Sequence, residues 1–178
     1  LGTDTLVLTS ATHLASPTLA AKYTGFETLR INTGITQDMG NAPASITAIQ
    51  TMGVATVSNM TPAQAAAVQM RTNAAAGTAD NMAFSLATQS GTTDTLTIVA
   101  GTGTTTTGAL DIGTLNVTGF EILNIQANPG ASSTAGAGGA GDRTTNVGAL
   151  TGATLNTINL TGTAVNMSNL ATTVPVTI

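Results

Sequence analysis

Apolar and polar residues alternate along much of the chain with a period of two. Leu29 and Ile31, Leu96 and Ile98, and Leu123 and Ile125 each enclose one polar residue. Because successive side chains of a β-strand point to opposite faces, this alternation predicts half-buried strands. The same spacing recurs at Leu6/Leu8, Phe84/Leu86, Leu115/Val117, Ile158/Leu160 and Val176/Ile178. Gly and Asn clusters separate these runs, so we expect many short strands joined by turns.

One segment departs from the β pattern. The sequence TPAQAAAVQMR runs from Thr61 to Arg71 and contains a run of Ala. Thr61 can cap a helix, and Pro62 suits the first helical position. We therefore predict a short helix near residues 62–71.

The strand phrases form a loose internal duplication. TGFETLRI begins at Thr24 and TGFEILNI begins at Thr118; GTDTLVL (Gly2–Leu8) precedes the first phrase and GTTDTLTI (Gly91–Ile98) precedes the second. A third pair, TAIQTMG at Thr47 and NTINLTG at Asn156, follows them. The duplication predicts a first β-repeat over 1–90, with the short helix, and a second over 91–178, with a Gly-rich insertion at 130–142.

The duplicated phrase contains two of the three Phe residues of the chain, Phe26 and Phe120. We expect each to fill the interior at the same place in its repeat. Gly25 and Gly119 would provide the bend before each strand.

The composition favours thin, repetitive layers over one large core. Aromatic residues make up 2% of the chain and Trp is absent, while 38 residues are Thr. Small β-branched side chains fit stacked strands, so we predict an all-β fold, specifically a parallel β-solenoid with Gly/Thr-rich loop insertions. A β-sandwich is the alternative, although its core usually includes large aromatic side chains.

The charge and the cysteine content of the chain exclude several classes of partner and of metal site. The net charge is −4 and Lys22 is the only lysine, so the chain lacks the basic patch of a nucleic-acid-binding protein. No apolar run is long enough to predict a membrane span. Without Cys, disulfides and thiolate metal sites are excluded.

Three aspartates are candidate calcium ligands: Asp4, Asp94 and Asp142. Each follows Gly-containing sequence that resembles part of the calcium-binding nonapeptide G-G-x-G-x-D-x-U-x. Calcium prefers carboxylate and carbonyl oxygens. All three depart from the nonapeptide and none is in tandem with another, so the alternative is an Asp that accepts backbone N–H bonds at a turn.

No catalytic residue is predicted, and we expect the chain not to be an enzyme. Glu27 and Glu121 are the only glutamates; they could ligate calcium, pair with an arginine or cap the adjacent turn. A glycosidase would need two carboxylates close together, whereas equivalent positions of two repeats should lie apart. His13 is the only histidine, which leaves almost no material for a triad or a zinc site.

The phrases GTDTLVL, TGFETLRI and VTGFEILNI resemble the Thr/Ala/Gly-rich, cysteine-free surface-layer proteins of Gram-negative bacteria such as Caulobacter. This RTX-associated family implies a β-solenoid secreted through a type I apparatus, which self-assembles into a two-dimensional lattice at the cell surface with calcium as a stabilising ion. The partner would be the protein itself, and cell-surface polysaccharide would bind through parts outside this segment. Because the chain opens on Leu1 and not on Met, we expect one continuous solenoid segment of a longer protein.

Two other functions stay open at the level of sequence. An RTX-type adhesin or biofilm-matrix module shares the composition, but a glycan site usually needs exposed aromatic residues, and Tyr23 is the only tyrosine. A β-helical polysaccharide-active enzyme would need charged residues clustered on one face, and the few carboxylates are scattered.

Overall fold

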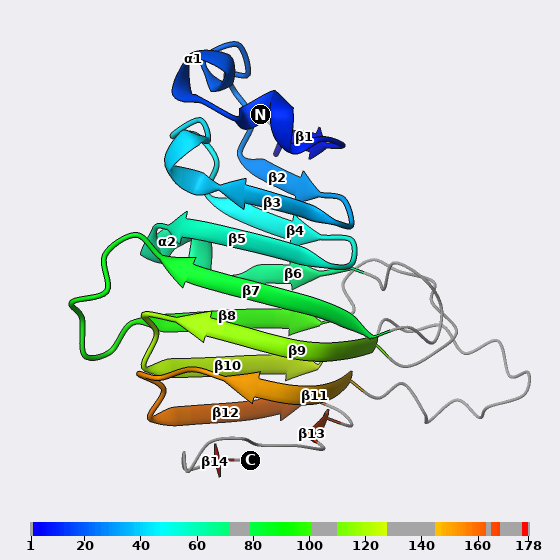
Figure 1. Cartoon of the computed structure of the whole chain (residues 1–178), viewed down its shortest axis with the longest axis vertical. Coiled ribbons are helices and arrows are strands. Elements are labelled where there is room, and N and C mark those ends of the chain that lie inside the picture. Colours follow the sequence, from blue (N-terminus) through cyan, green and yellow to red (C-terminus); the bar gives the residue numbers. More distant parts are fainter. Residues whose placement is uncertain are drawn as a thin grey trace, which may run out of the picture.

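The computed structural model describes residues 2–71, 79–100, 110–127, 145–162, 165–167 and 176–177. These residues form a mostly β chain with two parallel sheets that face each other (Figure 1). This confirms the predicted all-β class. The Gly/Thr-rich segment 101–109 and the predicted insertion at 130–142 lie outside the described residues.

The larger sheet has eight strands in the order β1-β2-β4-β6-β8-β10-β12-β14. Their bounds are β1 Thr5–Leu8, β2 Thr28–Ile31, β4 Ala48–Thr51, β6 Val68–Met70, β8 Thr95–Ala100, β10 Ile122–Ala127, β12 Thr157–Gly162 and β14 Val176–Thr177. Ile178, the last residue of the predicted alternation, is not among the described residues.

The smaller sheet has six strands in the order β13-β11-β9-β7-β5-β3. Their bounds are β3 Ile35–Asp38, β5 Ala55–Met60, β7 Asp80–Leu86, β9 Leu110–Thr118, β11 Thr145–Thr151 and β13 Val165–Met167. From β2 to β14, consecutive strands of the chain therefore alternate between the two sheets. Every described pairing is parallel, unlike the antiparallel sheets of the sandwich alternative.

Apolar residues from both sheets share one core. In the eight-stranded sheet, Leu29, Ile49, Val68, Ile98 and Ile125 lie in register on adjacent strands, and all are fully buried. Phe84, Leu115, Val117 and Leu150 are buried on the facing sheet. The described side chains of the predicted alternating pairs are buried, or, like Leu6 and Leu160, partly buried against this core. The period-two prediction is confirmed for them.

The two copies of the repeated phrase are offset along the strand direction. Leu6 lies opposite Leu29 in the first copy, and the equivalent Leu96 lies opposite Leu123 in the second. The column that contains Leu29, however, continues through β6 to Ile98 and not to Leu96. The second copy is therefore displaced by two residues, which keeps every side chain on the same face of the sheet.

The predicted helix near residues 62–71 is correct at its start and wrong at its end. α2 spans Pro62–Ala65, with Thr61 as the N-cap and a reciprocal bond from Gln64. Val68–Met70 forms β6 because Val68 and Met70 fill positions in the buried columns between β4 and β8. Burial of these side chains outweighs the weak helix propensity of the flanking Ala residues.

Three short helices near the N-terminal end were not predicted: the 3-10 helices η1 (Ala11–Leu14) and η2 (Met39–Asn41), and α1 (Pro17–Ala20). The side chain of Gln37 on β3 donates to the Leu14 carbonyl at 3.4 Å, and Asn41 donates to the Ala15 carbonyl at 3.4 Å. The η1–α1 segment is therefore anchored beside β3, the edge strand of the six-stranded sheet (Figure 1).

Candidate functional site: two carboxylate clamps

The structure brings Asp4 together with Glu27, at the start of the first two strands. Oε2 of Glu27 accepts the backbone N–H of Asp4 at 2.9 Å. In return, the Asp4 carbonyl accepts the backbone N–H groups of Glu27 and Thr28 at 3.2 and 3.1 Å. We call this arrangement a carboxylate clamp, because one side chain and two backbone groups tie β1 to β2.

The second copy of the phrase builds the same clamp between Asp94 and Glu121. Oε2 of Glu121 accepts the Asp94 N–H at 2.8 Å. The Asp94 carbonyl accepts the N–H groups of Glu121 and Ile122 at 2.9 and 3.0 Å. The recurrence of sequence is thus matched by a recurrence of hydrogen bonds, here between β8 and β10.

The residues before each glutamate explain how its side chain is placed. Gly25 and Gly119 have φ values of 82° and 79°, a left-handed conformation that turns the chain before the strand. Phe120 is then fully buried, whereas Phe26 is partly buried against the same core. Because the glycine sets the turn and the phenylalanine is held by the core, the glutamate that follows lies opposite the aspartate at the start of the neighbouring strand.

Each glutamate also connects to a third strand through its backbone. The Glu27 carbonyl accepts the N–H groups of Thr47 and Ala48, which lead into β4. The Glu121 carbonyl accepts those of Asn156 and Thr157, which lead into β12. This places the third pair of similar phrases, at Thr47 and Asn156, in equivalent positions.

The two clamps differ in exposure. Glu121 is 7% exposed and Asp94 is half-buried, while Glu27 is half-buried and Asp4 is exposed. The second clamp therefore lies in the better shielded environment, where its hydrogen bond competes less with water.

Neither glutamate makes the arginine pair that was one alternative, within the described part of the chain. Nε of Arg30 donates to Oε1 of Gln50 at 2.9 Å, and Gln50 donates to Gln69 at 2.9 Å. This ladder runs along the outer face of the eight-stranded sheet. Arg143 lies outside the described residues.

Each clamp joins one glutamate carboxylate to the backbone of an aspartate, which is far fewer ligands than a complete calcium site. Calcium takes six to eight oxygens. No group of three or more His, Cys, Asp or Glu comes together in the described ranges. Asp142, the third predicted ligand, lies outside them. Asp94 folds back over Gly91, where a Cβ would meet its carboxylate, so Asp94 closes the turn that precedes β8.

The glutamates lie far apart from each other. β2 and β10 are separated by three strands in the sheet, which corresponds to roughly 19 Å at the usual strand spacing. The carboxylates of a glycosidase pair lie only about 5–9.5 Å apart. His13 is exposed in η1.

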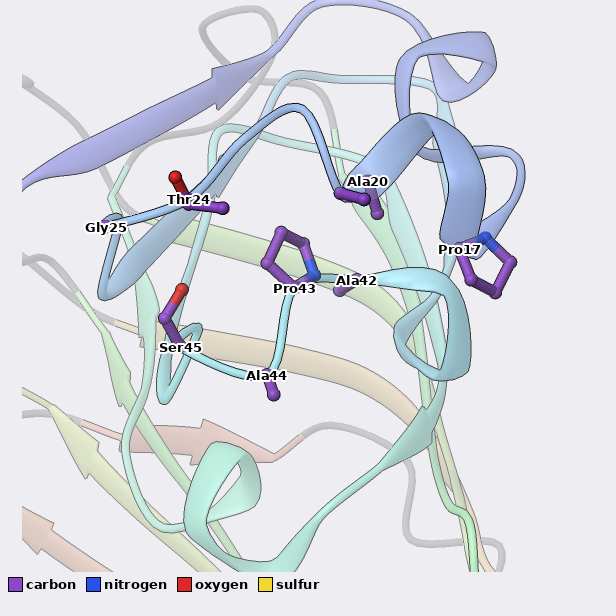
Figure 2. A pocket seen from close by; sticks show the side chains of 9 residues that line it. Pro17, Ala20, Thr24, Gly25, Ala42, Pro43, Ala44 and Ser45 are labelled. Atoms are coloured by element: carbon purple, nitrogen blue, oxygen red, sulfur yellow. The ribbon is translucent and has the colours of Figure 1, made fainter.

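A separate apolar pocket of about 350 Å³ lies near the N-terminal end (Figure 2). It is lined by Pro17, Ala20, Ala21, Thr24, Gly25, Ala42, Pro43, Ala44 and Ser45. Only Thr24 and Ser45 bring side-chain hydroxyls, and none of the predicted site residues lines it. It offers small apolar contacts without a charged group.

Several buried polar residues were not singled out from the sequence, among them Asp80 and Gln64. Asp80 on β7 is 1% exposed, and it stands two residues before Met82 in the inward phase of the alternation. The position of Asp80 in the alternation is the sequence signal from which its burial could have been predicted. Gln64 is 5% exposed and donates to the Ile46 carbonyl at 2.9 Å; its position inside a predicted helix gave no such signal.

Comparison with protein-family models, with curated proteins and with solved structures finds no match to this chain. Among the described residues, no helix is long and apolar enough to cross a membrane.

Proposed function

We propose that this chain is a structural segment of a bacterial cell-surface layer that self-associates into a two-dimensional lattice with calcium as a stabilising ion. The observation that carries the proposal is the pair of equivalent clamps in one stack of parallel strands. The repeated unit recurs as a structural element. The described residues contain no cluster of catalytic groups, and this combination is typical of a structural protein.

We further propose that the two sheets are the two faces of one parallel β-solenoid. The alternation of consecutive strands between the sheets supports this, since each pair of strands then makes one coil. Phe84 and Phe120, both fully buried, would fill the interior between the faces. Coils that contact only their neighbours can be added without redesign of the core.

The surfaces of the sheets support self-association. On the eight-stranded sheet, Asn159 donates to Asn124 at 2.8 Å and Asn124 donates to Thr97 at 3.2 Å, so polar groups are arranged in rows. Such neutral rows let a neighbouring molecule approach closely. The net charge of −4 then makes assembly sensitive to divalent cations.

Calcium would act at the clamps. Asp4 and Asp94 would each contribute a carboxylate, and the second oxygen of Glu27 or Glu121 would join it. Backbone carbonyls and water would complete the shell, as is common for this ion. Asp142 is retained as a third ligand from the sequence.

The experiment is an assembly assay on the native full-length protein in millimolar calcium and in chelator, followed by electron microscopy and light scattering. We expect ordered sheets in calcium that dissolve in chelator. Asp4→Asn, Asp94→Asn and Asp142→Asn should each raise the calcium concentration at half-assembly.

Asp4→Glu and Asp94→Glu are the matched controls. Each keeps a carboxylate at its position and leaves the net charge at −4, so each should leave the calcium concentration at half-assembly close to that of the parent chain. A protein that stays monomeric in both conditions would refute the lattice, and glycan binding would become the leading alternative.

A further inference from the structure

The outer face of the six-stranded sheet consists of short side chains. We call it the Thr face and define it by its central column, in which each residue is in register with the next on the neighbouring strand. The column is Thr36, Thr56, Ala83, Asn116 and Thr151. Ala83 is half-buried and the other four are exposed.

The residues that flank the central column are similar. Asn81 and Thr114 lie two positions before it, and Ser85 and Thr118 two positions after it, on β7 and β9. Asp38, on the edge strand β3, is the charged residue among the described side chains of this face. Side chains of similar length make the surface flat and nearly neutral.

The hydroxyls of this column are available to a partner. Within the described part of the chain, the side chains of Thr36, Thr56 and Thr151 make no hydrogen bond. The outer face of the eight-stranded sheet differs, because Arg30, Gln50 and Gln69 bond to one another there. On the Thr face the threonine hydroxyls of the central column are thus not engaged with each other. The bonds on this face lie outside that column, where Asn59 donates to Asp38 and Asn81 accepts the Thr114 N–H.

We propose that the Thr face binds the Thr face of a second copy of this chain, about a two-fold axis that lies parallel to the strands and passes over β7. This inference rests on the proposed self-association and specifies the surface that makes it. Such an axis places β3 of one copy opposite β11 of the other.

The central column is complementary to itself under this symmetry. Ala83 meets Ala83 on the axis, where two methyl groups allow the sheets to approach. Thr36 then faces Thr151, and Thr56 faces Asn116. Hydroxyl and amide groups both donate and accept hydrogen bonds, so each of these pairs can be satisfied.

The orientation keeps the Asp38 carboxylates of the two copies apart. If β3 lay opposite β3, both carboxylates would lie over the same pair of edge strands. With β3 opposite β11, they lie at opposite ends, separated by four strand spacings or roughly 19 Å. That distance exceeds the screening length of about 8 Å at physiological ionic strength.

The area sets the strength of the contact. Five strands by three outward residues cover roughly 24 by 20 Å, so a pair of faces buries on the order of 1,000 Å². Stable interfaces usually bury about 1,200–2,000 Å². A single contact is therefore weak, and an array that repeats it gains from multivalency.

Cysteine cross-linking tests the symmetry, because the chain has no native Cys. Ala83→Cys places a thiol on the axis, and a short bis-maleimide should join two copies under assembly conditions. The control is Gln126→Cys, an exposed position on β10 in the other sheet. We expect at least about tenfold more cross-linked dimer from Ala83→Cys, because the contact raises the effective concentration of its thiols.

A second measurement uses exposed positions, so that it does not depend on the half-buried Ala83. A mixture of Thr36→Cys and Thr151→Cys chains should cross-link to each other more than either does to itself. Ordered assembly with equal cross-linking of Ala83→Cys and Gln126→Cys would overturn the Thr-face contact while the lattice stands. Cross-linking at Ala83 without calcium-dependent sheets would support the contact and refute the lattice.

Discussion

At the residue scale, identical sequence does not produce identical burial. Phe26 and Phe120 occupy the same position of the repeated phrase, each after a glycine with positive φ. Phe120 is fully buried between strands on both sides, whereas Phe26 lies near the N-terminal end and is partly buried. The phrase predicted the turn and the inward side chain correctly, but not how many neighbours would cover it.

This difference gives a matched pair of substitutions. We expect Phe120→Ala to lower the free energy of unfolding by about 3–5 kcal/mol, the usual range for a buried Phe. Phe26→Ala should lower it by roughly half as much, because part of the ring already contacts water. Urea titration monitored by circular dichroism measures both. Equal losses would show that the two positions are equally covered in solution.

At the element scale, capping chemistry determined where α2 begins. Thr61 accepts the Gln64 N–H at 3.3 Å, and the Gln64 side chain accepts the Thr61 N–H at 2.9 Å. Thr61 and Pro62 are local signals, so the start of the helix could be read from sequence. Its end could not, because Val68 joins a column whose other members are distant in sequence.

Removal of the cap tests its contribution. We expect Thr61→Ala to destabilise the protein by about 1 kcal/mol, the typical loss of an N-cap. Thr61→Ser keeps the hydroxyl and should change stability little. The comparison is made by thermal unfolding of the two variants and the parent chain. A Ser variant as unstable as the Ala variant would assign the effect to the lost methyl group.

The clamps could be predicted only in part. The Asp and Glu residues were identified from their repeated phrases, but the sequence did not indicate that Glu27 would reach the Asp4 N–H. That bond depends on the parallel register of β1 and β2, which is a property of two segments 23 residues apart. The period-two pattern, which is local, predicted the inward side chains well.

At the scale of the whole molecule, each strand contacts mainly the strands on either side of it in its sheet. β4, for example, pairs only with β2 and β6. Coupling between the two ends of the stack must therefore pass through all the intermediate strands. Structures of this kind open locally, in units of neighbouring layers.

A core substitution should accordingly act locally. Leu29→Ala, at a fully buried position on β2, should raise hydrogen exchange in β1, β2 and β4 more than in β10 and β12. Leu123→Ala on β10 should show the reverse pattern. Hydrogen–deuterium exchange with mass spectrometry measures both. A uniform increase along the chain would mean that the stack unfolds as a single cooperative unit.

The two-residue displacement between the copies of the phrase bears on how such a chain can change over generations. Pairs of codons gained or lost within a strand leave the apolar columns facing inward, because the displacement preserves parity. In the eight-stranded sheet a single codon would turn every following side chain of that strand toward solvent. The six-stranded sheet, in contrast, contains one-residue register shifts between β5 and β7 and between β7 and β9. In the eight-stranded sheet, insertions or deletions of an even number of residues should therefore be retained more often than those of an odd number. The second copy of the phrase, displaced by two residues, is an example of such an even change.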